Sequence, residues 1–86
     1  MNTRALLEDL VSVNSMNPSL VPGAPGEAAV GAVAAGALRT AGLDVVLQEV
    51  APGRPNVIGV LEGREPGPTL MFCGHLDTVG VAGMID

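Results

Sequence analysis

The stretch TLMFCGHLDTV, residues 69–79, carries the most information about the fold of this chain. Its first part, residues 69–73, is nearly all apolar, which is typical of a strand buried on both faces of a sheet. His75 and Asp77 follow two residues apart, so in extended geometry both side chains point to the same side. Strand ends of open α/β sheets are where loops converge on a ligand. We therefore expect a central strand with a His–Asp pair at its carboxyl end.

A histidine beside a carboxylate is a common metal-site pairing. One ring nitrogen binds the metal, and the other donates to the carboxylate, which fixes the tautomer and raises the basicity of the ligand. The residues alone fit equally a half-buried His75 that a surface Asp77 satisfies, and both interpretations stay open. Cys73 lies on the same side and could be a thiolate ligand or nucleophile, but we expect a small buried strand residue, because free cysteine is among the most buried residue types. Gly74 leaves space for a metal or substrate.

The residues before this stretch predict two helices and two further strands. Helical spacing of apolar residues indicates a helix that Thr3 caps, running to about residue 13, and a second helix over about residues 27–41 that ends at Gly42. Residues 45–50 and 56–61 have strand composition, with turns after each. The second and third strands are close enough in sequence for a hairpin. The predicted fold class is therefore α/β, order α-α-β-β-β, with both helices packed on a mixed sheet whose central strand is residues 69–73.

Two glycines and three polar residues of the helical half need separate interpretation. Gly31 and Gly36 weaken the second helix but allow a neighbour to approach closely. We expect Ser15 and Asn17 to be loop residues that cap and turn the chain, rather than a nucleophile and a positioning group. Glu27 is expected to act through helix-start electrostatics.

Composition excludes several classes of function. The chain has 86 residues, enough for one small domain, and a formal net charge of −5 with no basic patch, so we expect neither a nucleic-acid partner nor an anionic membrane partner. A single cysteine favours a reducing compartment. The N-terminus lacks the pattern of a signal peptide, and the longest weakly polar run, residues 28–38, is too short to span a bilayer. A cytoplasmic protein is expected.

Residues 70–79 resemble the first metal-binding motif of a zinc-dependent superfamily of aminoacylases, deacetylases and carboxypeptidases. It includes acetylornithine deacetylase, succinyl-diaminopimelate desuccinylase and glutamate carboxypeptidase. The motif is an apolar strand followed here by Gly74-His75-Leu76-Asp77-Thr78-Val79. Supporting stretches agree in order and spacing: residues 6–11 with 15–18, residue 27 with 38–43, and residues 56–60. The likeness covers nearly all of this chain, but only the opening portion of such an enzyme.

The resemblance implies that residues 1–86 are the N-terminal portion of a zinc-peptidase-like catalytic domain. His75 would bind one ion of a two-zinc site, for which cobalt is a possible substitute, and Asp77 would be its catalytic partner. The complete enzyme would hydrolyse an amide bond of a small N-acyl amino acid or peptide, and could be a homodimer. Metal-generated hydroxide and a glutamate proton shuttle would carry the reaction.

The remaining ligands, the glutamate base and the dimerisation domain find no counterpart in these residues. Residues 78–86 run on without a terminating element, so we expect that the chain is truncated after the first motif. We also expect that the chain is inactive by itself, and its sequence does not identify the substrate. The alternative is a catalytically inert small α/β module for binding or assembly.

Overall fold

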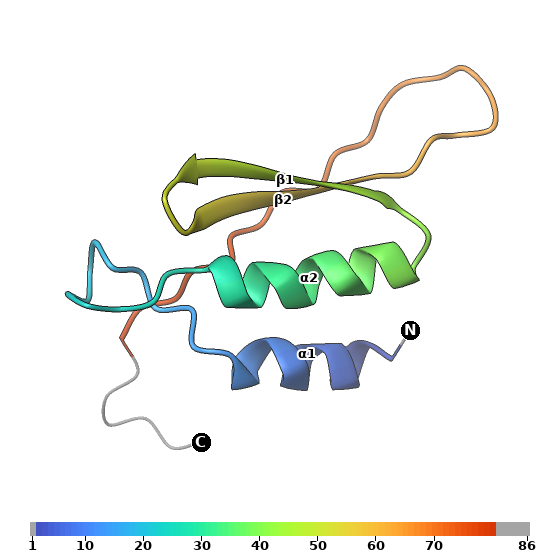
Figure 1. The fold of residues 1–86 in the computed structure, drawn as a ribbon. Coiled ribbons are helices and arrows are strands. Elements are labelled where there is room, and N and C mark those ends of the chain that lie inside the picture. Colours follow the sequence, from blue (N-terminus) through green and yellow to red (C-terminus); the bar gives the residue numbers. More distant parts are fainter. Residues whose placement is uncertain (1, 81–86) are drawn as a thin grey trace.

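Two helices and one antiparallel hairpin build the part of the chain that the structure describes, residues 2–80 of a computed structural model. In chain order these are α1 (Thr3–Ser12), α2 (Ala28–Thr40), β1 (Asp44–Ala51) and β2 (Arg54–Val60). Helix α2 lies between the hairpin and α1, so the molecule has three layers (Figure 1). The chain is mixed α and β, as predicted, and all four elements lie within a few residues of their expected positions.

Local signals define the helix ends. The side chain of Asn2 accepts a hydrogen bond from the Ala5 N–H at 3.1 Å, so Asn2 is the N-cap and the expectation of a Thr3 cap is wrong. Thr3 is instead the first helical residue. Helix α2 ends as predicted at Gly42, whose φ of 94° is the left-handed conformation that glycine adopts without strain. The Gly42 and Leu43 N–H groups donate back to the Arg39 and Leu38 carbonyls, each at 3.0 Å, which is a Schellman motif.

The core lies between α2 and the hairpin. Val30 and Ala35 are buried, and a Cβ atom at Gly31 would meet the Val57 side chain at 3.4 Å. The predicted close approach is therefore confirmed at Gly31, whereas nothing lies within 4 Å of a Cβ atom at Gly36, where the prediction is wrong.

Only α2 packs on the sheet, because α1 packs against α2 instead (Figure 1). The prediction that both helices cover the sheet is wrong for α1. Two strands spaced about 4.8 Å apart offer width for only one helix of about 10 Å diameter.

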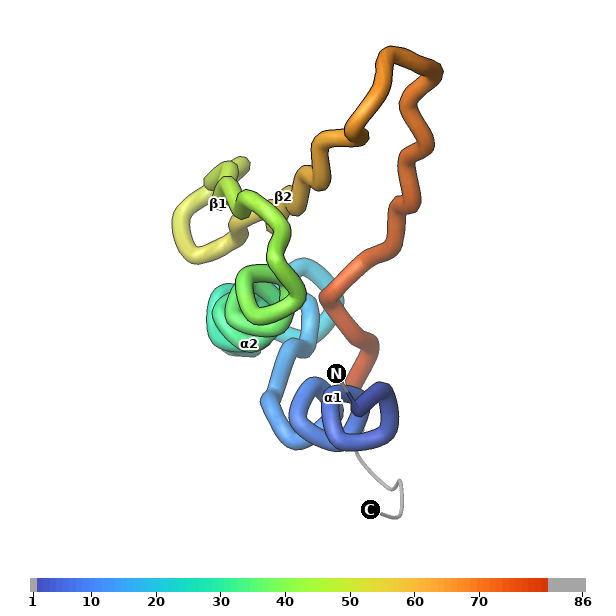
Figure 2. The backbone as a smooth tube through the Cα atoms, turned by 90° about the vertical axis from the view of Figure 1, so that its right-hand side faces the viewer, coloured from blue at the N-terminus to red at the C-terminus, as the bar shows by residue number. Residues whose placement is uncertain are grey.

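The hairpin joins the first two predicted strands, not the second and third. Asp44 pairs with Val60 and Glu49 with Pro55, and the sheet is antiparallel rather than mixed. Its turn is short, and Gly53 takes a positive φ of 72° there. The connection after β2 is a long loop that rises away from the hairpin and returns (Figure 2). A tight turn closes a pair at lower entropic cost than a long loop.

The predicted central strand is not formed in the described part of the chain. Residues 69–73 pair with no other strand there, and Leu70, Met71 and Phe72 are 78%, 80% and 89% exposed. Cys73 is exposed as well, so the expectation of a buried cysteine is also wrong. An apolar strand becomes central only when neighbours take its backbone groups and cover its faces. In residues 2–80 the two existing strands pair with each other, and neither forms strand hydrogen bonds with residues 69–73.

Two sequence expectations concern the ends and the membrane. The unfinished loop expected for residues 78–86 falls mostly outside the described residues. Within residues 2–80, neither helix combines the length and apolar character that crossing a bilayer requires.

Candidate functional site

A short parallel bridge brings the loop after α1 beside the His–Asp motif. Thr78 donates its N–H to the Ser15 carbonyl and accepts from the Asn17 N–H, both at 2.9 Å, with Met16 opposite Thr78. Ser15 is buried, at 5% exposure, whereas Met16 is half-buried and Thr78 is exposed. Residues separated by about sixty positions in sequence thus form one site.

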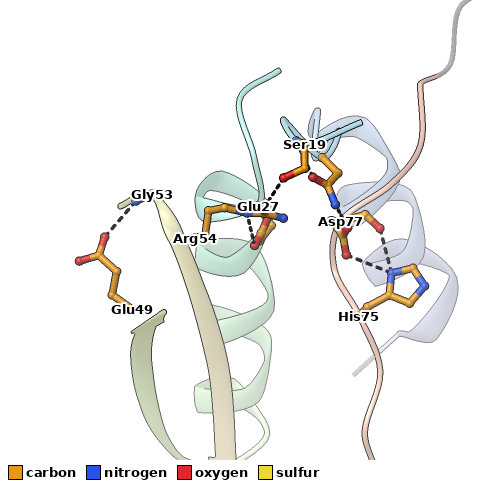
Figure 3. A network of polar contacts seen from close by, with 8 residues as sticks. Ser19, Glu27, Glu49, Gly53, Arg54, His75 and Asp77 are labelled. Carbon is orange, nitrogen blue, oxygen red and sulfur yellow. Dashed lines mark hydrogen bonds and ion pairs between the residues drawn. The ribbon is translucent and has the colours of Figure 1, made fainter. Parts of the chain in front are cut away.

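His75 and Asp77 lie together, as the spacing predicted (Figure 3). The His75 Nδ1 atom is 3.3 Å from Asp77 Oδ1 and 2.9 Å from the Asp77 backbone oxygen. Both oxygens only accept hydrogen bonds, so Nδ1 carries a proton, and in the neutral imidazole Nε2 keeps its lone pair. The His75 side chain is 85% exposed and that of Asp77 is 30% exposed. The imidazole therefore offers Nε2 as a ligand atom, while Nδ1 contacts Asp77.

Asn17 completes the site from the other side. Its Nδ2 donates to Asp77 Oδ2 at 2.7 Å, and its Oδ1 accepts from the Ser19 N–H at 2.8 Å. The second bond is the turn-forming role that the sequence predicted. The first bond was missed, because a single sequence gives no periodic or local signal for a contact between side chains sixty residues apart.

The carboxyl group of Asp77 is ionised at neutral pH. The hydrogen bond from Asn17 is the main cause that lowers the pKa of Asp77 below its ordinary 3.8, partial desolvation opposes it, and the charges of His75 and Arg54 add to the lowering. Of the ionised carboxylate, Oδ2 accepts from Asn17, and Oδ1 lies 3.3 Å from Nδ1 of His75.

Glu27 and Arg54 form an ion pair next to this site (Figure 3). Arg54 Nε lies 3.1 Å and 3.3 Å from the two Glu27 carboxylate oxygens, and its guanidinium reaches the Ser19 hydroxyl at 3.5 Å. The expectation that Glu27 acts at the helix start is incomplete. It occupies the N-cap position of α2 without a side-chain capping bond, because its carboxylate is turned to Arg54. The pair connects α2, β2 and the loop that carries Asn17.

Among the described residues, His75 is the candidate metal ligand. In residues 2–80, no three His, Cys, Asp or Glu side chains gather closely enough to hold a metal ion. His75, with a carboxylate on Nδ1 and an exposed Nε2, fits the geometry of a single zinc ligand. It also lines a surface depression of about 460 Å³, together with residues 10–16, Val30, Leu76 and Thr78. The arrangement can orient the lone pair of His75 Nε2 and place the negative charge of the Asp77 carboxylate next to Nδ1.

Comparison of the chain with models of protein families, with curated proteins and with solved structures finds no match. The likeness to zinc-dependent amidohydrolases therefore rests on the sequence motif alone.

Proposed function

We propose that this chain supplies the first metal ligand, His75, and its orienting partner, Asp77, to a cytoplasmic zinc-dependent amide hydrolase. The observation that carries the proposal is the state of the imidazole. Nδ1 is held by Asp77, at 3.3 Å from the carboxylate and 2.9 Å from the backbone oxygen, and the exposed ring leaves Nε2 free to bind. The resemblance of residues 70–79 to the metal-binding motif of zinc-dependent amide hydrolases supports the proposed class of enzyme.

Each residue would have one task. His75 would hold zinc through Nε2, and Asp77 would fix the ring and raise its basicity. Zinc held there would supply a Lewis acid for a substrate carbonyl and for bound water. A catalytic zinc takes about three protein ligands. The proposal therefore requires further ligands and a proton-transferring glutamate from outside residues 2–80. The substrate would be a small N-acyl amino acid or peptide.

The test uses the protein encoded by the complete reading frame that contains these residues. We expect zinc- or cobalt-dependent hydrolysis of N-acetyl amino acids or dipeptides, lost in His75→Ala and reduced about 10–100-fold in Asp77→Asn, since groups that orient a ligand have effects of that size. Asp44→Asn is the control, because Asp44 lies at the exposed start of β1. Absence of metal-dependent hydrolysis, or full activity in His75→Ala, would overturn the proposal.

A second candidate is an inert α/β module for binding or assembly. The exposure of Leu70, Met71 and Phe72 favours it, because contiguous exposed apolar side chains mark interaction surfaces. This candidate predicts that the same assays detect no hydrolysis with any divalent metal. It also predicts that Phe72→Ser removes a binding activity while His75→Ala leaves that activity intact.

A further inference from the structure

We infer that Asn17 is a positioning residue of this site: it holds the Asp77 carboxylate so that one oxygen faces His75. The inference rests on the proposed function for its purpose, because orienting Asp77 matters only if His75 binds a metal. Its geometry stands independently of that function. The Asn17 Nδ2 to Asp77 Oδ2 contact, at 2.7 Å, leaves Oδ1 as the oxygen next to the imidazole.

The orientation of the Asn17 amide is fixed by its two partners. The Ser19 N–H can only donate, so the amide oxygen must face it, and this bond is 2.8 Å long. The ionised Asp77 carboxylate can only accept, so the amide nitrogen must face Asp77. Both requirements give the same orientation, and a flipped amide would lose both hydrogen bonds.

Backbone contacts hold Asn17 in place independently of its side-chain bond to Asp77. Its N–H donates to the Thr78 carbonyl at 2.9 Å, and its carbonyl accepts from the Val21 N–H at 2.9 Å. Pro18 follows and restricts Asn17 to extended conformations. The carboxylate of Asp77 has no comparable restraint from the bridge, since the bridge fixes the backbone and leaves the side-chain torsions free. Asn17 is thus the rigid partner and Asp77 the one that is held.

His75 Nδ1 contacts both the backbone oxygen and the carboxylate of Asp77, and Asn17 acts only on the carboxylate. The Asp77 backbone oxygen, at 2.9 Å from Nδ1, keeps the proton on Nδ1 whatever the carboxylate does. Loss of Asn17 should therefore leave the tautomer of His75 unchanged and free the rotation of the Asp77 side chain. The charged acceptor then spends less time at Nδ1, which lowers the basicity of Nε2 as a metal ligand.

The experiment measures the Asp77 side-chain rotamer by three-bond NMR couplings in the full 86-residue chain near pH 8. We expect one χ1 rotamer in the wild type and averaging over several in Asn17→Asp and Asn17→Ser. Asn17→Asp keeps an acceptor for the Ser19 N–H, removes the donor and adds a negative charge. Asn17→Ser removes that donor without adding charge. Unchanged amide signals from β1 and β2 verify that each variant is folded.

Asn14→Asp is the matched control. Asn14 lies in the same loop and accepts from the Met16 N–H at 3.1 Å, so this variant adds the same charge and keeps its acceptor. It should show the wild-type Asp77 rotamer. A single rotamer in both Asn17 variants would overturn the inference. Averaging in Asn17→Asp without averaging in Asn17→Ser would also overturn it, since charge repulsion rather than loss of the amide donor would then move Asp77.

A Zn²⁺ titration followed at the His75 ring signals connects the inference to the proposed function. Asn17→Ser should bind Zn²⁺ about tenfold more weakly than the wild type, the lower end of the range for groups that orient a ligand. If Zn²⁺ leaves the wild-type ring signals unmoved, the proposed function fails while the rotamer result stands. If wild type and Asn17→Ser bind Zn²⁺ equally, the positioning role fails while the ligand role of His75 stands.

Discussion

At the scale of single residues, the site is a chain of three side chains in which each holds the next. Asn17 donates to one oxygen of the Asp77 carboxylate, and the other oxygen lies 3.3 Å from Nδ1 of His75. The sequence predicts His75 as a ligand with Asp77 as its partner, because their spacing in an extended segment is a local property. The contribution of Asn17 depends on a parallel bridge between residues 16 and 78, which no local pattern predicts.

The lowered pKa of Asp77 gives this chain of contacts a pH dependence. A carboxyl group whose pKa falls on folding stabilises the folded state above its ordinary value of 3.8, and this contribution is lost as pH falls through the folded value. We expect Asp77 to titrate below its ordinary value in the wild type, and Asn17→Ala to move its pKa upward. The charged groups that face it, His75 and Arg54, remain in both proteins. Carbon-13 NMR of the labelled carboxyl group measures both titrations. An unchanged pKa in Asn17→Ala would contradict the assigned cause.

At the scale of elements, the helices and the first two strands follow from the sequence because their signals are local. Apolar periodicity, an N-cap at Asn2 and a left-handed Gly42 define the helices, and the short turn at Gly53 closes the hairpin. Residues 69–73 show the limit of such signals. Their apolar composition predicts burial, but burial requires neighbouring strands, and residues 2–80 supply none beside this segment.

The ion pair between Glu27 and Arg54 should contribute to the docking of α2 on β2. Its side chains are 14% and 27% exposed, so Glu27→Gln should lower the free energy of unfolding by about 1–2 kcal/mol, between the values for exposed and buried pairs. The exposed Arg4–Glu8 pair of α1 is the control, and Glu8→Gln should cost about 0.3–0.5 kcal/mol. Urea unfolding of the three proteins measures the difference. Equal losses in both variants would show that the Glu27 pair is only a surface contact.

At the scale of the whole molecule, a small core sits beside a large exposed apolar segment. Val30 and Ala35 are the buried hydrophobic residues of the described part, whereas Leu70, Met71 and Phe72 are open to solvent. The predicted α/β class holds at the coarse level. The three-stranded sheet and the zinc-peptidase domain stay predictions, because both require elements that residues 2–80 do not provide.

The number of ligands at this scale sets an upper limit on metal affinity. Tight zinc sites combine three or four deprotonated ligands, and in residues 2–80 no three such side chains gather closely enough to hold a metal ion. We therefore expect the 86-residue chain by itself neither to bind zinc tightly nor to hydrolyse N-acyl amino acids.

The most direct test of the central claim, that His75 is a metal ligand held by Asp77, is a Zn²⁺ titration of the nitrogen-15-labelled chain near neutral pH, read at the two imidazole nitrogens. The account predicts weak, saturable binding, micromolar or weaker, that shifts Nε2, leaves the proton on Nδ1 and disappears in His75→Ala. A resonance of Nε2 that Zn²⁺ does not move would contradict the role of His75. Submicromolar binding lost in His75→Ala would contradict the conclusion that this chain supplies a single ligand.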